Sequence, residues 1–131
     1  MTQHSNLLTT KNSVLLLIDI QDRLIQAMPE ESAEDMREYS ARLTEAANLL
    51  DVPVFLTEQY PQGLGATIDT LNEKLSTSTK RFEKTSFSCV AVEGFMEALN
   101  QSGRKQVIIA GQGTYAARLS SAYIRRYVLL T

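Results

Sequence analysis

The chain has 131 residues, of which 44% are hydrophobic and 21% are charged, and its formal net charge is −2 at pH 7. These fractions are those of an ordinary globular domain, and the lack of a basic face argues against nucleic acid as a partner. No apolar run approaches the ~20 residues that cross a bilayer. The polar residues 1–12 lack the apolar core of a secretory signal. We therefore expect a cytoplasmic protein without membrane contact, with a flexible tail over 1–12 and one domain over 13–131.

The first predicted strand is an unbroken apolar run over 14–18, followed directly by Asp19. Because its residues do not alternate between apolar and polar, the strand should be covered on both faces, as central strands of parallel sheets are. Open α/β sheets bind their ligands at the carboxyl ends of such strands, which is one interpretation of Asp19. The other is that Asp19 only caps a helix that begins near Gln21.

Strand and helix patterns alternate along the rest of the chain. The expected elements are a short helical turn over 23–28, an amphipathic helix over 33–50 with Ser32 as N-cap, a strand over 53–57, a loop over 58–66, a short helix over 68–75, an edge strand over 80–84, a helix over 90–101 that Gly103 ends, a strand over 107–110 followed by Gly111, a helix over 114–126 and a strand that begins at 127–130. This order predicts a three-layer α/β fold with a parallel sheet. Since no helix follows the last strand, one face of the sheet should lack cover, as in a C-terminally incomplete domain.

Three features are expected at the carboxyl edge of the sheet: Asp19, Lys84 and the turn at 111–118. An acid can take a proton, a lysine can favour an anion, and backbone N–H groups at a helix start can form an oxyanion hole, so the set suits nucleophilic catalysis. The alternatives are that Lys84 is a solvated surface lysine and that Gly111 only provides the open backbone of a turn.

Four segments in order carry a resemblance to a known family: LLLIDIQDRL (15–24), VPVFLTEQYPQGLG (52–65), EKTSFS (83–88) and VIIAGQGTY (107–115). The sequence resembles the isochorismatase-like cysteine hydrolases, and among them the isochorismatase domain-containing proteins. The resemblance implies a Rossmann-like three-layer sheet and an Asp-Lys-Cys triad, in which Asp19 receives the thiol proton and Lys84 holds the thiolate. It also implies that Gln59 and Tyr60 belong to the substrate-pocket loop.

The third member of that triad is missing. Where the family has a pattern like AGxETHxCV, this chain reads AGQGTYAAR, so Ala117 stands at the cysteine position. By the match, the backbone of Ala116 and Ala117 would form the oxyanion turn. A methyl group cannot attack a carbonyl carbon, so the covalent mechanism cannot run at Ala117. The family's chain also continues for several more elements, and a frame error, a damaged gene or a genuine pseudoenzyme would each give this pattern.

The chain has one cysteine, Cys89, and one histidine, His4. Cys89 follows Lys84 at the head of the predicted 90–101 helix, where a thiol pKa would be lowered, but a small buried apolar residue is the favoured interpretation. A single histidine in the tail excludes a histidine-rich metal site and a His-containing triad unless the tail folds back. Nicotinamidases hold a metal with histidines after the second strand, and the loop at 58–60 has none, so no metal or cofactor is expected.

The resemblance implies hydrolysis of a small amide, ester or vinyl ether through a cysteine thioester or thiohemiacetal-like intermediate, with activity impaired because position 117 is Ala117. The rival hypothesis is a non-catalytic member that keeps a pocket for a small ligand or pairs with another subunit. A third is a marginal fragment without function. Family members commonly assemble, and an incompletely covered sheet adds a physical reason to associate, so we expect a homo-oligomer.

Overall fold

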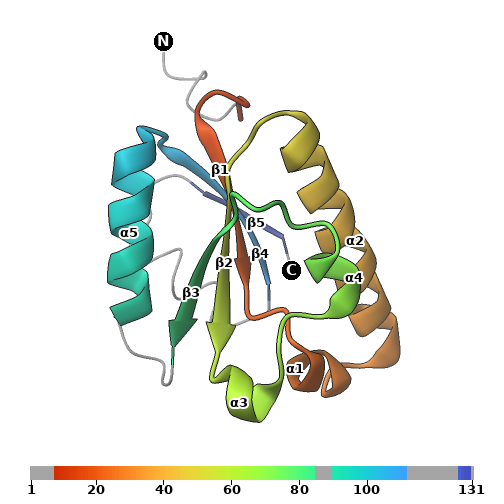
Figure 1. Ribbon diagram of the computed structural model, residues 1–131. Helices are drawn as coiled ribbons and strands as arrows, with labels where there is room; N and C mark the ends of the chain where they lie inside the picture. The colour runs from red at the N-terminus through yellow and green to blue at the C-terminus, as the bar shows by residue number, and fades with distance from the viewer. Residues whose placement is uncertain (1–7, 85–89, 112–126, 131) are drawn as a thin grey trace.

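The computed structural model describes residues 8–84, 90–111 and 127–130, and of 84, 90–93 and 127–130 only the backbone. Its strands form one parallel sheet in the order β3-β2-β1-β4-β5 (Figure 1). The strands are β1 (Ser13–Ile18), β2 (Val54–Gln59), β3 (Lys80–Lys84), β4 (Gln106–Gly111) and β5 (Tyr127–Leu130). The predicted α/β class, the central place of β1 and the edge position of β3 are therefore confirmed.

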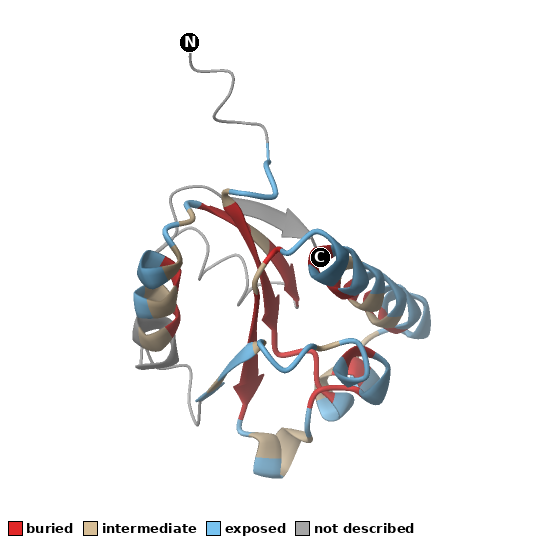
Figure 2. Cartoon of the chain, turned by 45° about the horizontal axis from the view of Figure 1, so that its top comes forward, coloured by how far each residue is buried: buried red, intermediate tan, exposed pale blue. Residues whose placement is uncertain are grey.

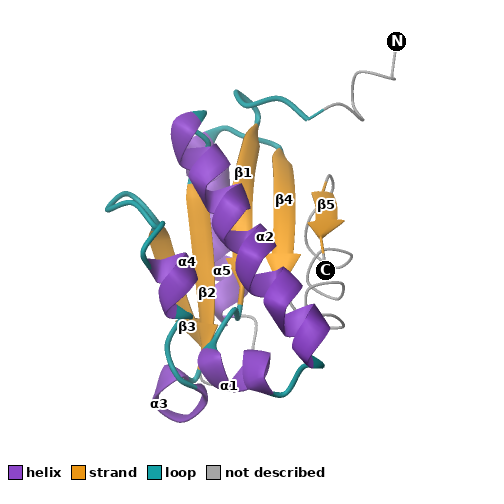
Figure 3. Ribbon diagram, turned by 90° about the vertical axis from the view of Figure 1, so that its right-hand side faces the viewer, coloured by secondary structure: helices purple, strands orange, loops and turns teal. Residues whose placement is uncertain are grey.

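Helices lie on both faces of this sheet, which gives three layers (Figures 1 and 3). The helices are α1 (Asp22–Gln26), α2 (Glu30–Leu49), α3 (Pro61–Leu64), α4 (Asp69–Asn72) and α5 (Val90–Ser102). Helices α1, α2 and α4 cover one face, and α5 covers the other. The expected helix over 114–126 lies outside the described residues. In the part of the chain that the structure describes, no helix is long and apolar enough to cross a membrane.

The core explains why β1 reads as a continuous apolar run. All six residues of β1 are buried (Figure 2). Leu15 and Leu17 pack in the cluster under α2, whereas Leu16 and Ile18 pack in the cluster under α5. Because side chains alternate between the faces of a strand, a strand buried on both faces needs an apolar residue at every position.

An aromatic group fills the layer between the sheet and α5. The rings of Phe55 and Phe95 meet edge to face with their centroids 5.4 Å apart, and Phe82 packs edge to face against both. Edge-to-face pairs of this kind add about 0.5–1.5 kcal/mol beyond the area that they bury. This group therefore attaches α5 to β2 and to the edge strand β3.

The long helix α2 begins earlier than its sequence pattern predicts. It starts at Glu30 rather than at 33, and Pro29 stands at its N-cap with φ −54° and ψ 142°. The predicted N-cap Ser32 is therefore wrong, because Ser32 lies within the first turn. The proline ring sets φ before the helix, and Glu30 and Glu31 in the first turn complement the helix dipole.

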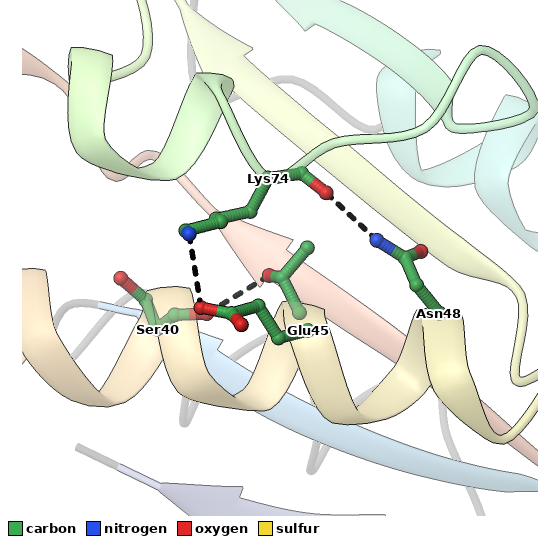
Figure 4. A network of polar contacts seen from close by, with 5 residues as sticks. Ser40, Glu45, Asn48 and Lys74 are labelled. Carbon is green, nitrogen blue, oxygen red and sulfur yellow. Dashed lines mark hydrogen bonds and ion pairs between the residues drawn. The ribbon is translucent and has the colours of Figure 1, made fainter.

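Polar contacts join α2 to the chain that follows α4 (Figure 4). The Lys74 ammonium lies 3.1 Å from a Glu45 carboxylate oxygen, and the Asn48 side chain donates to the Lys74 carbonyl oxygen at 2.7 Å. Both side chains of the ion pair are about half exposed, so the pair itself contributes little to stability.

Two further helix predictions differ in outcome. The helix predicted over 68–75 is shorter, because only α4 forms there. Gly103 ends α5 with φ +72°, as expected.

The segment after β2 is more ordered than a simple loop. Glu58 and Gln59, expected in the loop over 58–66, extend β2 because they pair with Glu83 and Lys84 of β3. The following residues form α3. Pairing with a neighbouring strand therefore outweighs the polar character of these residues, which had suggested a loop.

Gly111 is needed because two strands approach closely. It pairs with Ile18 at the end of β4, and a Cβ at Gly111 would lie 2.5 Å from the Ile18 carbonyl oxygen. Its φ is not among the positive values, which among the glycines belong to Gly65 and Gly103. The expectation that Gly111 serves the turn by an open backbone is thus corrected, because contact with β1 is what excludes a side chain there.

We expect Gly111→Ala to lower the free energy of unfolding by about 3 kcal/mol, the upper range for overpacking, because the blocking atom belongs to the backbone of β1. Urea denaturation followed by circular dichroism measures this change. Gly94→Ala is the matched control, since its Cβ would meet two atoms of the Phe82 ring, at 3.3 and 3.5 Å, and, among the described residues, no backbone atom of another element within 4 Å. Equal effects of the two substitutions would contradict this account of Gly111.

Candidate functional site

The carboxyl ends of β1, β2, β3 and β4 bring Asp19, Gln59 and the backbone of Lys84 to one edge of the sheet. Ile18, which precedes Asp19, pairs with Thr57 of β2 and with Gly111 of β4. Gln59 pairs with Lys84 through the backbone at the ends of β2 and β3. Since the strands are parallel, these ends form one edge, and it is at this edge that open α/β sheets bind their ligands.

Asp19 occupies a strained and enclosed position at this edge. Asp19 is 5% exposed, and its φ of 54° lies in the left-handed region. Its carboxylate accepts a hydrogen bond from Thr57 Oγ1 at 2.8 Å, and its N–H donates to the Thr57 carbonyl oxygen at 3.1 Å. Left-handed backbone outside glycine is uncommon, although aspartate tolerates it, and it is frequent at functional sites.

The interpretation of Asp19 as a helix cap is wrong. Helix α1 begins at Asp22 with Gln21 at its N-cap, and the cap has no side-chain hydrogen bond. The Asp19 carboxylate instead bonds across to β2, to the hydroxyl of Thr57. The ligand-edge interpretation therefore agrees with the geometry.

Gln21 is a central residue of the edge that the sequence pattern did not single out. It is fully buried, and its amide nitrogen donates to the carbonyl oxygens of Gln59 at 3.0 Å and Gly65 at 2.7 Å. Its amide oxygen accepts from the Gln59 N–H at 2.7 Å. The available sequence signal was a polar residue that continues a buried strand, a place where a polar group needs internal partners.

A second polar contact holds the same segment. Glu58 is 7% exposed, and its Oε2 accepts from both the N–H and the hydroxyl of Thr67 at 2.8 Å. This contact was also missed, because the side chain of a loop glutamate would ordinarily be solvated. Together with Gln21, it closes the chain between β2 and α4 into a compact loop.

The predicted pocket residues Gln59 and Tyr60 lie at this loop. Gln59 is 7% exposed, and its side-chain oxygen Oε1 is buried with no hydrogen-bond partner among the described residues. Tyr60 is 49% exposed and has a left-handed backbone with φ 39°. Its ring lies over Gly63, where a Cβ would be 2.2 Å from Tyr60 Cε2. An unpartnered buried acceptor is costly, and it is the kind of group that a ligand donor can satisfy.

Several predicted residues cannot be placed in this geometry. Ala116 and Ala117 of the expected oxyanion turn, and Cys89, lie outside the described residues, and so does the side chain of Lys84. Within the described ranges, no group of three or more His, Cys, Asp or Glu side chains is arranged to hold a metal ion.

A three-layer parallel sheet with a buried acid at the end of its central strand defines an open α/β fold of the class that binds ligands at the carboxyl edge. The isochorismatase domain matches residues 13–123, and the chain belongs to this family. The isochorismatase domain-containing protein 2 of Danio rerio is 37% identical over 117 residues, which are 88% of this chain and 56% of that protein.

Solved structures agree with this assignment. The MAR1 ribonuclease from Caenorhabditis elegans superimposes with a TM-score of 0.78 at 28% identity, covering 94% of this chain and 64% of that one. The YcaC gene product from Escherichia coli, an octameric hydrolase of unknown specificity, has a TM-score of 0.74 at 21% identity over 94% of this chain and 63% of its own, which shows the fold alone. The chain spans about half the length of the relatives it matches by sequence.

We expect Thr57→Val to lower the free energy of unfolding by about 1–3 kcal/mol, because it keeps the shape of the side chain but removes the buried donor to Asp19. Chemical denaturation of the two proteins measures the difference. Thr70→Val, at an exposed position of α4, is the control and should change stability much less. If both substitutions had the same small effect, the Thr57–Asp19 bond would not hold the site together.

Proposed function

We propose that this domain acts on a small amide, ester or vinyl ether, and that its thiol-dependent chemistry is blocked at Ala117. The observation that carries the proposal is Asp19, buried and held in a left-handed conformation by Thr57 at the carboxyl edge. Membership of a hydrolase family and the presence of Lys84 at the end of β3 support it. The acid and the lysine of the triad are thus both retained in the sequence.

In the thiol-dependent reaction, Asp19 takes the proton of a cysteine thiol and Lys84 stabilises the thiolate. The sulfur then forms a bond to the carbonyl carbon, the alcohol or amine leaves with a proton, and water releases the acid. Ala117 has no proton to give and no lone pair to attack with. Amides and esters should therefore bind without efficient turnover in this chain.

A vinyl ether differs because its hydrolysis needs no side-chain nucleophile. An acid donates a proton to the double-bond carbon, water adds to the resulting cation, and the C–O bond breaks to release an alcohol and a carbonyl compound. A positioned carboxyl group can serve as that acid. In its protonated form Asp19 is such a group, and it recovers its proton from the added water, so this substrate class is the one that Ala117 does not exclude.

Ligand binding without turnover is the second candidate, and a specific observation favours it. The buried Oε1 of Gln59, without a partner among the described residues, can accept from an N–H or O–H group of a bound molecule. Tyr60, half exposed beside it in sequence, would border the same ligand. A small polar molecule is therefore the expected ligand whether or not it is turned over.

Net charge and structural relatives bear on the location, the oligomeric state and the ligands of this protein. We propose a cytoplasmic homo-oligomer, in line with the octamer of the Escherichia coli relative. One structural relative is a ribonuclease, but the net charge of −2 does not favour RNA binding. Small molecules rather than nucleic acid are thus the proposed substrates or ligands.

We expect Ala117→Cys to raise the rate of p-nitrophenyl acetate hydrolysis at least about 100-fold over the unmodified chain, because it restores the nucleophile of the family's triad. Release of p-nitrophenol measures this rate, and intact mass should show an added acetyl group on the enzyme. Asp19→Asn in the same background should remove most of the gain.

Ala116→Cys is the matched control, since it places a thiol one residue away from the nucleophile position. Equal gains at the two positions would reflect ordinary thiol reactivity and would contradict the proposed triad. A separate assay with a simple vinyl ether tests the unmodified chain. Turnover lost in Asp19→Asn supports acid catalysis, whereas no turnover together with saturable binding leaves the ligand-binding function.

A further inference from the structure

The proposed chemistry gives Gln21 no role, yet its side chain is extensively hydrogen-bonded. Its side chain is fully buried and makes three hydrogen bonds to backbone groups, two of them to Gln59 at the end of β2 and one to Gly65 in the loop that follows. Two of these fix the N–H and the carbonyl of Gln59, and the third fixes the carbonyl of Gly65. One amide therefore holds both the start and the end of the loop that carries Gln59 and Tyr60.

Backbone contacts place the far end of the loop against the residues that follow β1. Asp22 donates to the Ala66 carbonyl at 3.3 Å, and Ile68 donates to the Ile20 carbonyl at 3.1 Å. Gln21 itself forms an isolated antiparallel bridge with Thr67. The far end of the loop is thus hydrogen-bonded to the residues that follow β1.

The two side chains that leave β1 reach β2 in the same register. Asp19 bonds to Thr57 and Gln21 bonds to Gln59, and both pairs are separated by 38 residues. Gln21 therefore adds a side-chain link between the residues after β1 and the end of β2, two residues beyond the Asp19–Thr57 pair. Tyr60, the next residue, has a strained backbone that must be held by its surroundings.

We propose that Gln21 is a positioning residue, which fixes the loop bearing Gln59 and Tyr60 in register with Asp19. This inference rests on the proposed function, in which Gln59 and Tyr60 contact the bound molecule. Gln21 acts only through the loop and does not contact the ligand. Without it, Gln59 would keep its place in β2 but lose the side-chain contacts on its N–H and its carbonyl.

The test compares the Gln21→Met variant with the unmodified chain by peptide-resolved hydrogen exchange. Methionine keeps the length of the side chain but loses its donors and its acceptor. We expect exchange over 59–65 to become at least about tenfold faster, while exchange over β4 stays unchanged. Gln26→Met, at an exposed position of α1, should change neither region. Gln21→Glu, which replaces both donors by an oxygen facing the Gln59 and Gly65 carbonyl oxygens, should loosen the loop at least as much as Gln21→Met.

A purely structural role would raise exchange everywhere or lower stability with no local effect, and either result overturns the proposal. In the Ala117→Cys background, Gln21→Met should raise KM for p-nitrophenyl acetate about fivefold and leave kcat within about twofold. A loosened loop with an unchanged KM would also overturn it. If Ala117→Cys hydrolyses nothing, the proposed function fails, and the exchange result still decides whether Gln21 holds the loop.

Discussion

Burial of β1 on both faces is the constraint on which the rest of this structure depends. A strand with apolar side chains toward both helix layers cannot shift register without losing a packing surface, so β2 and β4 are set against it. The contact is so close at its end that Gly111 has no room for a side chain beside Ile18. The polar residues that follow β1 are therefore delivered to a defined place.

The polar residues that follow β1 form hydrogen bonds that fix the carboxyl edge of the sheet. Asp19 and Gln21 alternate with buried Ile20, so the buried pattern of β1 continues into residues that carry hydrogen-bonding groups. Buried polar groups of this kind are costly unless they are paired, and here they pair with β2 and its loop. The carboxylate is thus held by strand packing rather than by the helix that follows it, and the same pairing orders the loop.

Positioning and reactivity are separable in this chain. The framework that holds the acid depends on β1, β2 and β4, whereas the thiol chemistry of the family depends on a residue after β4 that is alanine here. The loss of the covalent step is our proposal, whereas the packing that orients Asp19 comes from β1, β2 and β4. The buried Gln59 Oε1, which has no hydrogen-bond partner among the described residues, agrees with the proposal that the site binds a small polar molecule.

Local pattern by itself determined the parallel α/β class, the central position of β1, the edge position of β3 and the place of Asp19 at the carboxyl edge. These follow from the spacing of apolar residues, which burial on one or both faces imposes directly. Tertiary structure decided what depends on partners distant in sequence. Glu58 and Gln59 belong to β2 because β3 pairs with them, Gly111 is glycine because β1 lies against it, and Gln21 is buried because the loop closes over it. No local signal encodes these contacts, since each joins residues that only the folded sheet brings together.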